Sequence, residues 1–189
     1  MIKILGKQYV DKLSQVLKEI HWDSIESLYN DIHKAWMNNN TVFFCGNGGS
    51  AGNANHIAND FLYGIAKKHG EGLSAVSLSS NSSILTCLAN DIGYDKIYSE
   101  QLSVYAKKND ILVVLSGSGN SANINSVLDE AKEMNVKSHA ILGFDGGKAL
   151  KKADNSIHLS INDMQIAEDS QLIIAHIIMQ KLYDIRNKF

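Results

Sequence analysis

The chain has no proline, only two cysteines among its 189 residues and no run of basic side chains. Cys45 and Cys87 lack a C-x-x-C spacing, which predicts two reduced, buried thiols in a cytoplasmic protein. A formal net charge of −2 without a basic cluster argues against nucleic acid as the main ligand. No segment resembles a signal peptide or a membrane span, so we expect no membrane partner. What remains is the composition of one soluble domain, with 44% hydrophobic and 20% charged residues.

Short apolar segments alternate with amphipathic ones over most of the chain. Strands are predicted at residues 41–45, 73–79, 111–115, 137–142 and 156–161, and helices at 50–64, 82–89, 97–107, 121–134, 147–153 and 165–187. Strands separated by helices imply right-handed βαβ units and a parallel sheet that is covered on both faces. We therefore expect a single α/β domain over residues 1–189. Residues 41–189 should form a three-layer sandwich around a five-stranded parallel sheet.

The first 40 residues predict two amphipathic helices that form an N-terminal helical hairpin. One apolar stripe includes Val10 and Leu17, and the other includes Ile25, Ile32 and Trp36. These stripes need to be covered. Either they form an oligomer contact or they pack on the chain's own sheet, and the sequence leaves both possibilities open.

Two predicted strands run directly into loops of glycine, serine and asparagine. Residues 46–52 (GNGGSAG), here called the first loop, follow one strand, and residues 116–121 (SGSGNS), the second loop, follow another. At such a junction the first N–H groups of the helix have no intrahelical partner and the helix dipole favours an anion. Ser121 is also placed as a helix N-cap. Because neither loop contains a cation, the pair predicts neutral donors for a phosphate and for sugar hydroxyls.

The first loop also matches a dinucleotide-binding fingerprint, with Gly46, Gly48 and Ala51 after a strand. That fingerprint requires an acidic residue about 20 residues further on, at the end of the next strand. Residues 76–81 (VSLSSN) contain no carboxylate, and the chain has no P-loop motif. The sequence therefore disfavours both NAD and a nucleoside triphosphate.

Ionisable side chains lie on two of the predicted helices. His56 and Asp60 are four residues apart and share a face, a spacing typical of metal ligands and also of surface ion pairs. The last helix contains Glu168, Asp169 and His176 in an otherwise apolar run. That histidine is either a core residue or directed at a site. Asp169 aligns with it slightly better than Glu168, so spacing alone does not choose between the carboxylates.

Several short motifs together resemble the sugar isomerase (SIS) domain family and, within it, the phosphoheptose isomerases. They are residues 45–51 (CGNGGSA), His56, and residues 83–86 (SILT), 90–94 (NDIGY), 116–121 and 145–148 (DGGK). This family interconverts sedoheptulose 7-phosphate and D-glycero-D-manno-heptose 7-phosphate for lipopolysaccharide or capsule heptose. The resemblance spans roughly residues 25–185. It implies a flavodoxin-like sandwich, a homotetramer with sites at subunit interfaces, and one zinc ion per site.

Matched position by position, the resemblance also implies roles for particular residues. Asp60, Glu168 and His176 are the implied catalytic residues, and with His56 they are the implied metal ligands. The implied substrate-binding residues are Asn47, Gly48, Gly49, Ser50, Asn90, Asp91, Ser116, Gly117, Ser118, Ser121 and Glu168. The chain departs from the family where Asp60 replaces a glutamate, Glu168 a glutamine, Gly64 an arginine and Gly117 a threonine.

Aldose–ketose isomerisation moves a proton between adjacent carbons through an enediol. It needs a base near the carbon acid, and an acid or metal to neutralise the enediolate oxygen. Asp60 is one methylene shorter than glutamate, so either Asp60 or Glu168 is the base in this hypothesis. Two alternatives stay open: an isomerase of another phosphosugar, and a non-catalytic SIS-fold binding or replication-regulatory protein.

Overall fold

Five parallel strands form the centre of the structure, a computed structural model that describes residues 1–67 and 71–186. They are β1 (Thr41–Gly46), β2 (Ser74–Ser77), β3 (Ile111–Ser116), β4 (Lys137–Leu142) and β5 (Asn155–His158). Their order across the sheet is β2-β1-β3-β4-β5, and every neighbouring pair is parallel. The predicted five-stranded α/β sandwich is confirmed.

Two hydrophobic cores, one on each face of the sheet, explain why the central strands β1 and β3 are almost entirely apolar. Successive side chains of a strand point to opposite faces. Val42 and Phe44 of β1 accordingly enter one core, while Phe43 and Cys45 enter the other. A strand that is buried on both faces therefore needs no polar alternation.

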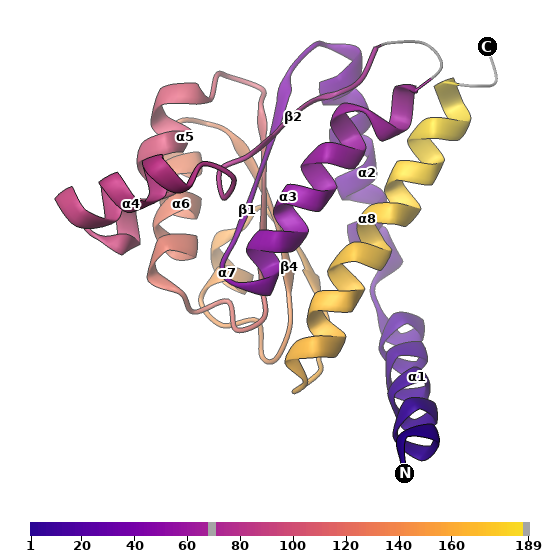
Figure 1. Cartoon of the computed structure of the whole chain (residues 1–189). Coiled ribbons are helices and arrows are strands. Elements are labelled where there is room, and N and C mark those ends of the chain that lie inside the picture. The colour runs from indigo at the N-terminus through magenta and orange to yellow at the C-terminus, as the bar shows by residue number, and fades with distance from the viewer. Residues whose placement is uncertain (68–70, 187–189) are drawn as a thin grey trace.

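Helices cover both faces of the sheet (Figure 1). One core contains residues of α2 (Trp22–Met37), α3 (Gly49–Leu62) and α8 (Met164–Arg186). The opposite core contains residues of α5 (Ser99–Tyr105), α6 (Ala122–Glu133) and α7 (Ala149–Lys152). Short 3-10 turns occupy Gly64–Ala66 and Tyr94–Lys96. None of the helices among the described residues is long and apolar enough to cross a membrane.

The two N-terminal helices form as predicted, but they are not folded back on each other as a hairpin. Helix α1 (Ile2–Glu19) ends at Ile20, whose extended backbone leads within two residues into α2. The helices therefore follow one another, and α1 projects from the sandwich beside the start of α8 (Figure 1). Tyr9 donates a hydrogen bond to Asp169 of α8, and Lys12 forms an ion pair with Asp163. The short extended connection and these contacts with α8 explain the difference.

The apolar stripes of the two helices have different surroundings. Ile25, Ile32 and Trp36 of α2 are buried in the core of their own sheet. On α1 the apolar side chains nearest the N-terminus are exposed; they are Met1, Ile2, Ile4, Leu5 and Val10. Packing on the sheet is thus the outcome for α2, whereas the N-terminal half of α1, with Val10, leaves its apolar side chains exposed in the single chain.

A partly buried hydrogen bond attaches α2 to the sheet. His139 of β4 is completely buried, and its Nε2 lies 2.9 Å from Asp31 Oδ2 on α2. The Asn155 amide donates to Nδ1 of the same ring, so Nε2 carries the proton and donates to Asp31. Burial lowers the pKa of His139 below its usual value, an effect that the Asp31 carboxylate partly offsets.

Helix α4 (Ser82–Asp91) contradicts one expectation. It projects from the other end of the sandwich (Figure 1), and none of its residues is buried. Cys87 lies on this helix and is exposed, so the prediction of two buried thiols holds only for Cys45. The helical pattern was correct, but a helix that leaves the body of the domain does not bury its side chains.

Candidate functional site

The first loop follows β1 at the carboxyl edge of the sheet and leads into α3. Because β1 has β2 on one side and β3 on the other, the order in which the chain adds strands reverses between β1 and β3. In open α/β sheets such a reversal opens a crevice at the carboxyl ends of the strands, where ligands bind. A Cβ on Gly46 would lie 2.7 Å from the Ser50 backbone, so only glycine allows this approach of strand and helix. Both predicted loops lie at this crevice.

Asn47 of the first loop forms a reciprocal amide pair with Asn123 of α6. Each Nδ2 donates to the other side chain's Oδ1 at 2.8 Å. The Tyr94 hydroxyl also donates to Asn47 Oδ1, at 3.1 Å. Tyr98, which is almost fully buried, donates to the Gly46 carbonyl beside it. Sequence patterns gave no role to Asn123 or Tyr98, nor to Tyr94 of the 90–94 motif, because all three lie far from Asn47 along the chain.

The second loop uses part of its polar chemistry to hold its own shape. Ser116 Oγ accepts from the Gly119 N–H, and Ser118 Oγ accepts from the Asn120 N–H. Gly119 has φ +63°, and a Cβ there would lie 2.0 Å from the Gly146 carbonyl oxygen. Ser121 occupies the N-cap position of α6 as predicted, but its side chain makes no capping hydrogen bond. The loop therefore presents serine oxygens and helix N–H groups at the crevice.

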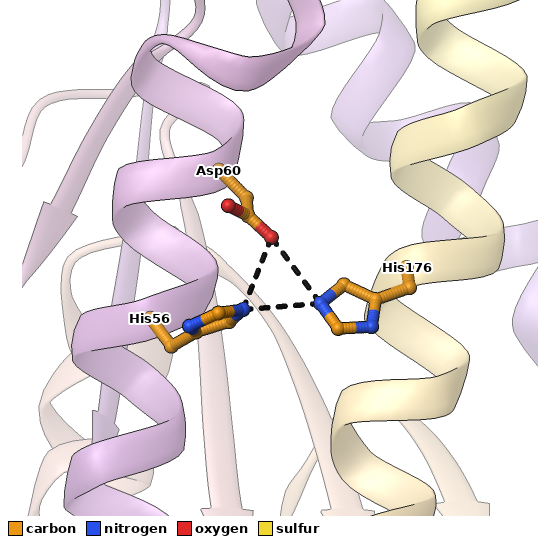
Figure 2. Close-up of side chains that lie close together, drawn as sticks. All are labelled: His56, Asp60 and His176. Atoms are coloured by element: carbon orange, nitrogen blue, oxygen red, sulfur yellow. Dashed lines mark hydrogen bonds and ion pairs between the residues drawn. The ribbon is translucent and has the colours of Figure 1, made fainter.

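His56, Asp60 and His176 converge between α3 and α8, and together we call them the triad (Figure 2). The two Nε2 atoms are 3.1 Å apart, and Asp60 Oδ2 lies 3.3 Å from His56 Nε2 and 3.2 Å from His176 Nε2. The side chains of His56 and His176 are 51% and 42% exposed. His176 is therefore no core residue, and the shorter carboxylate of Asp60 reaches both rings.

The geometry of the triad fits a divalent cation. Tetrahedral ligands bound at 2.0–2.1 Å lie about 3.3–3.4 Å from one another, which is close to the three separations in the triad. Two imidazoles and one carboxylate are ligands that zinc accepts. A catalytic zinc site uses three protein ligands and keeps one position open, as this arrangement would.

Glu168 lies apart from the triad. It precedes His176 by eight residues of α8, about 12 Å of helix. Its carboxyl group packs against the start of α3, where a Cβ on Gly49 would lie 2.3–2.5 Å from its atoms. The neighbouring Asp169 accepts the hydrogen bond from Tyr9; burial and this carboxylate raise the pKa of Tyr9 to about 12. Within the described residues, the potential metal ligands that gather are therefore His56, Asp60 and His176.

A buried polar network holds α3 beside α8. Gln171 is almost fully buried, and its Nε2 donates to Ser50 Oγ at 3.2 Å. Asn53 of α3 donates to Gln171 Oε1 and to the Glu168 carbonyl, both at 2.9 Å. These bonds connect the first loop with α8 and set the register in which His176 faces His56. Ser50, predicted to bind substrate, thus also has a structural partner.

The loops and the triad occupy different places on one chain. Asp60 lies eleven residues after Gly49, about 16 Å further along α3. Asn90 and Asp91 lie at the exposed end of α4, where the Asn90 amide donates to the Asp91 carboxylate. Among the described residues, no hydrogen bond connects this pair with either loop or with the triad. The predicted site residues thus form three separate groups.

Comparison with known proteins identifies the family. Residues 8–143 match the SIS domain family model. A phosphoheptose isomerase of Helicobacter pylori strain Shi470 is 34% identical, covering 91% of this chain and 87% of its own. One of Aliarcobacter butzleri is 36% identical, covering 82% and 86%. The structure of a Neisseria gonorrhoeae phosphoheptose isomerase superposes with a TM-score of 0.87 and 26% identity, over 96% of both chains.

These matches span the first loop, the second loop and, in the relatives aligned over nine tenths of the chain, most of its length. The parallel sheet, the two loops and the paired helices agree with that assignment. The chain therefore belongs to the SIS domain family and, within it, to the phosphoheptose isomerases.

Proposed function

We propose that this chain is an aldose–ketose isomerase that converts sedoheptulose 7-phosphate to D-glycero-D-manno-heptose 7-phosphate. The observation that carries the proposal is the triad, in which one carboxylate and two imidazoles converge on an open face of the molecule. Family membership supplies the substrate, because the relatives that match most of the chain are phosphoheptose isomerases. The enzyme would serve the synthesis of heptose for lipopolysaccharide or capsule.

In this proposal Asp60 is the base. Its carboxylate would accept the proton from the carbon next to the carbonyl and return it to the neighbouring carbon. When no metal is bound, His176, whose Nε2 lies 3.2 Å from Asp60 Oδ2, would exchange a proton with the substrate oxygen as the enediol forms. The position of Glu168 against Gly49 favours Asp60 over Glu168 within one chain.

A zinc ion is the proposed cofactor, held by His56, Asp60 and His176. When bound, such an ion polarises a carbonyl oxygen and neutralises negative charge that develops on it. With Nε2 bound to zinc, His176 would have no proton to exchange at that atom, so the ion would neutralise the substrate oxygen in its place, while Asp60 would keep one carboxylate oxygen free to act as the base. Glu168 stays a candidate fourth ligand if it comes from another copy of the chain.

The second loop is the proposed phosphate site. Ser116, Ser118 and Ser121 lie at the start of α6, where the free N–H groups and the helix dipole favour an anion. The first loop, with Asn47 to Ser50, would then contact the sugar. Neither loop contains a cation, so the phosphate would be bound by hydrogen bonds rather than by ion pairs.

A homotetramer with active sites at subunit interfaces is the proposed assembly. Two observations support it: the exposed apolar side chains of α1, and the separation of about 16 Å between the first loop and Asp60. A heptose phosphate bound at the loops needs catalytic groups nearby, and a neighbouring chain can supply them. Light scattering at micromolar concentration tests this, and a monodisperse monomer would contradict it.

The decisive experiment is incubation of metal-free protein with sedoheptulose 7-phosphate in deuterium oxide, with and without added zinc. We expect product, and deuterium at the carbon that exchanges its proton, and we expect both to increase with zinc. His176→Ala provides the matched control, because it removes one imidazole without touching the loops. If the wild-type chain binds the sugar but exchanges no deuterium, a non-catalytic binding protein replaces the isomerase.

A further inference from the structure

Asn123 carries no role in the proposed reaction, yet it joins the two loops. It is the second residue of α6 and only 1% exposed. Its amide contacts Asn47 of the first loop, although the two residues are 76 positions apart in the sequence. A buried polar side chain is costly unless its hydrogen bonds are satisfied, so this position has a specific requirement for an amide.

One backbone bond decides the orientation of both amides. The N–H of Ile124 donates to Asn123 Oδ1 at 2.9 Å. A backbone N–H can only donate, so the atom that it contacts is the oxygen. The Asn123 Nδ2 group must then face Asn47, whose Oδ1 accepts from it. Asn47 Nδ2 in turn donates to Asn123 Oδ1.

The oxygen of Asn47 is fully used by the protein. It accepts from Asn123 Nδ2 at 2.8 Å and from the Tyr94 hydroxyl at 3.1 Å; the Tyr98 hydroxyl also lies 3.4 Å away, but its closer acceptor is the Gly46 carbonyl. These two donors match the two lone pairs of an amide oxygen. The Asn47 amide nitrogen has two hydrogens, of which Asn123 takes one. The other has no partner among the residues that the structure describes, and Asn47 is partly exposed at the crevice.

We propose that Asn123 is a positioning residue. By occupying the oxygen of Asn47, it leaves Asn47 able only to donate a hydrogen bond to a ligand at the first loop. Asn47 then offers a single N–H, which selects an oxygen acceptor on the sugar phosphate, either a carbonyl or hydroxyl oxygen. Because Asn123 begins the helix that follows the second loop, the same pair also fixes the distance between the two loops. The inference rests on the proposed function for the identity of the ligand.

A double-mutant cycle tests the proposal. Asn47→Ala, Asn123→Ala and the double variant are compared with wild type in kcat and KM for sedoheptulose 7-phosphate, and in thermal unfolding. If Asn123 acts through Asn47, each single variant raises KM about tenfold, the size expected for one hydrogen bond to ligand. The double variant should then be no worse than Asn47→Ala alone, because both changes remove the same contact.

A second pair of variants separates the role of the amide from a general loss of structure. Asn123→Asp keeps the size of the side chain and the acceptor for Ile124, but it places an oxygen against Asn47 Oδ1. We expect it to raise KM at least as much as Asn123→Ala. Asn135→Asp, at an exposed position just beyond the C-terminal end of α6, introduces the same charge without touching Asn47 and should leave KM unchanged.

The outcomes are distinct. Additive effects of Asn47→Ala and Asn123→Ala, or a wild-type KM in Asn123→Asp, overturn the positioning role while the isomerase proposal stands. A wild-type chain that neither binds nor converts sedoheptulose 7-phosphate overturns the proposed function and the ligand assignment together. The wild-type control therefore tells the two failures apart. If Asn123→Ala does not fold, the KM values of Asn123→Asp and Asn135→Asp decide whether Asn123 positions Asn47.

Discussion

The crevice at the carboxyl edge of the sheet and the triad between α3 and α8 are built in different ways. At the crevice, Asn47 is held by Asn123 and Tyr94, and Ser116 by the loop's own backbone. In the triad, His56 and His176 are about half exposed, and their polar contacts are with each other and with Asp60. The chain thus holds the polar side chains of the crevice in place by its own hydrogen bonds, whereas the triad depends on the register of two helices.

This difference suggests that the crevice and the triad have different roles. A preorganised edge binds its ligand without first being ordered, which preserves affinity. The triad lies on an open face, and its nitrogen and oxygen atoms can still bind a cation, a substrate or another chain. The network from Ser50 through Gln171 to Asn53 connects the two regions, because it positions α8 against the helix that starts at the first loop.

The largest expected effect comes from removing the base. We expect Asp60→Asn to lower kcat by about 10²–10⁴-fold, the usual contribution of general acid–base catalysis. Glu168→Gln should leave most activity, because its carboxyl group packs against Gly49 rather than in the triad. Deuterium exchange at saturating zinc measures both variants. The reverse order would make Glu168 the base and imply that it acts on the triad of another chain.

Adding a methyl group to the second loop should cost stability at the preorganised edge. In Gly119→Ala the new Cβ meets the Gly146 carbonyl at 2.0 Å, and the backbone has φ +63°. The strained backbone alone costs about 1–2 kcal/mol, and the collision adds to it. The matched control is Gly52→Ala on α3, where no atom lies within 4 Å of the added Cβ. Denaturant unfolding of both variants should show a lower free energy of unfolding for Gly119→Ala and no loss for Gly52→Ala.

Metal should stabilise the triad but leave the loops unchanged. A ligand at 100 times its dissociation constant raises the free energy of unfolding by about 2.7 kcal/mol. We therefore expect zinc to raise the thermal midpoint of the metal-free protein, and His56→Ala to abolish most of that increase. Elemental analysis should find one zinc per triad. An equal shift in wild type and His56→Ala would place the metal elsewhere on the protein.

The smallest effect is expected from a single phosphate donor. Ser118→Ala removes one hydroxyl of the second loop, and we expect KM to rise about tenfold with kcat nearly unchanged. The phosphate is bound alike in the ground state and the transition state, so the loss is one of uniform binding. A large decrease in kcat at unchanged KM would show instead that this loop takes part in the chemistry.

Regular patterns in the sequence predicted the elements correctly where local rules decide them. The five strands, the two loops after β1 and β3, and the helical face shared by His56 and Asp60 all follow from periodicity over a few residues. Local patterns did not show that α1 and α2 are not a hairpin, nor that Cys87 is exposed. Both depend on where a helix lies relative to the rest of the domain.

The sequence by itself determined the α/β sandwich, the two glycine-rich loops after β1 and β3, and the family, because buried strands and glycine-rich junctions leave local signatures. Only the tertiary structure decided that His176 meets His56 and Asp60 while Glu168 does not, and that Asn123 holds Asn47. These contacts join residues 76–120 positions apart. Their existence depends on how α8 packs on α3 and how β3 pairs with β1, and a pattern along the chain does not record either.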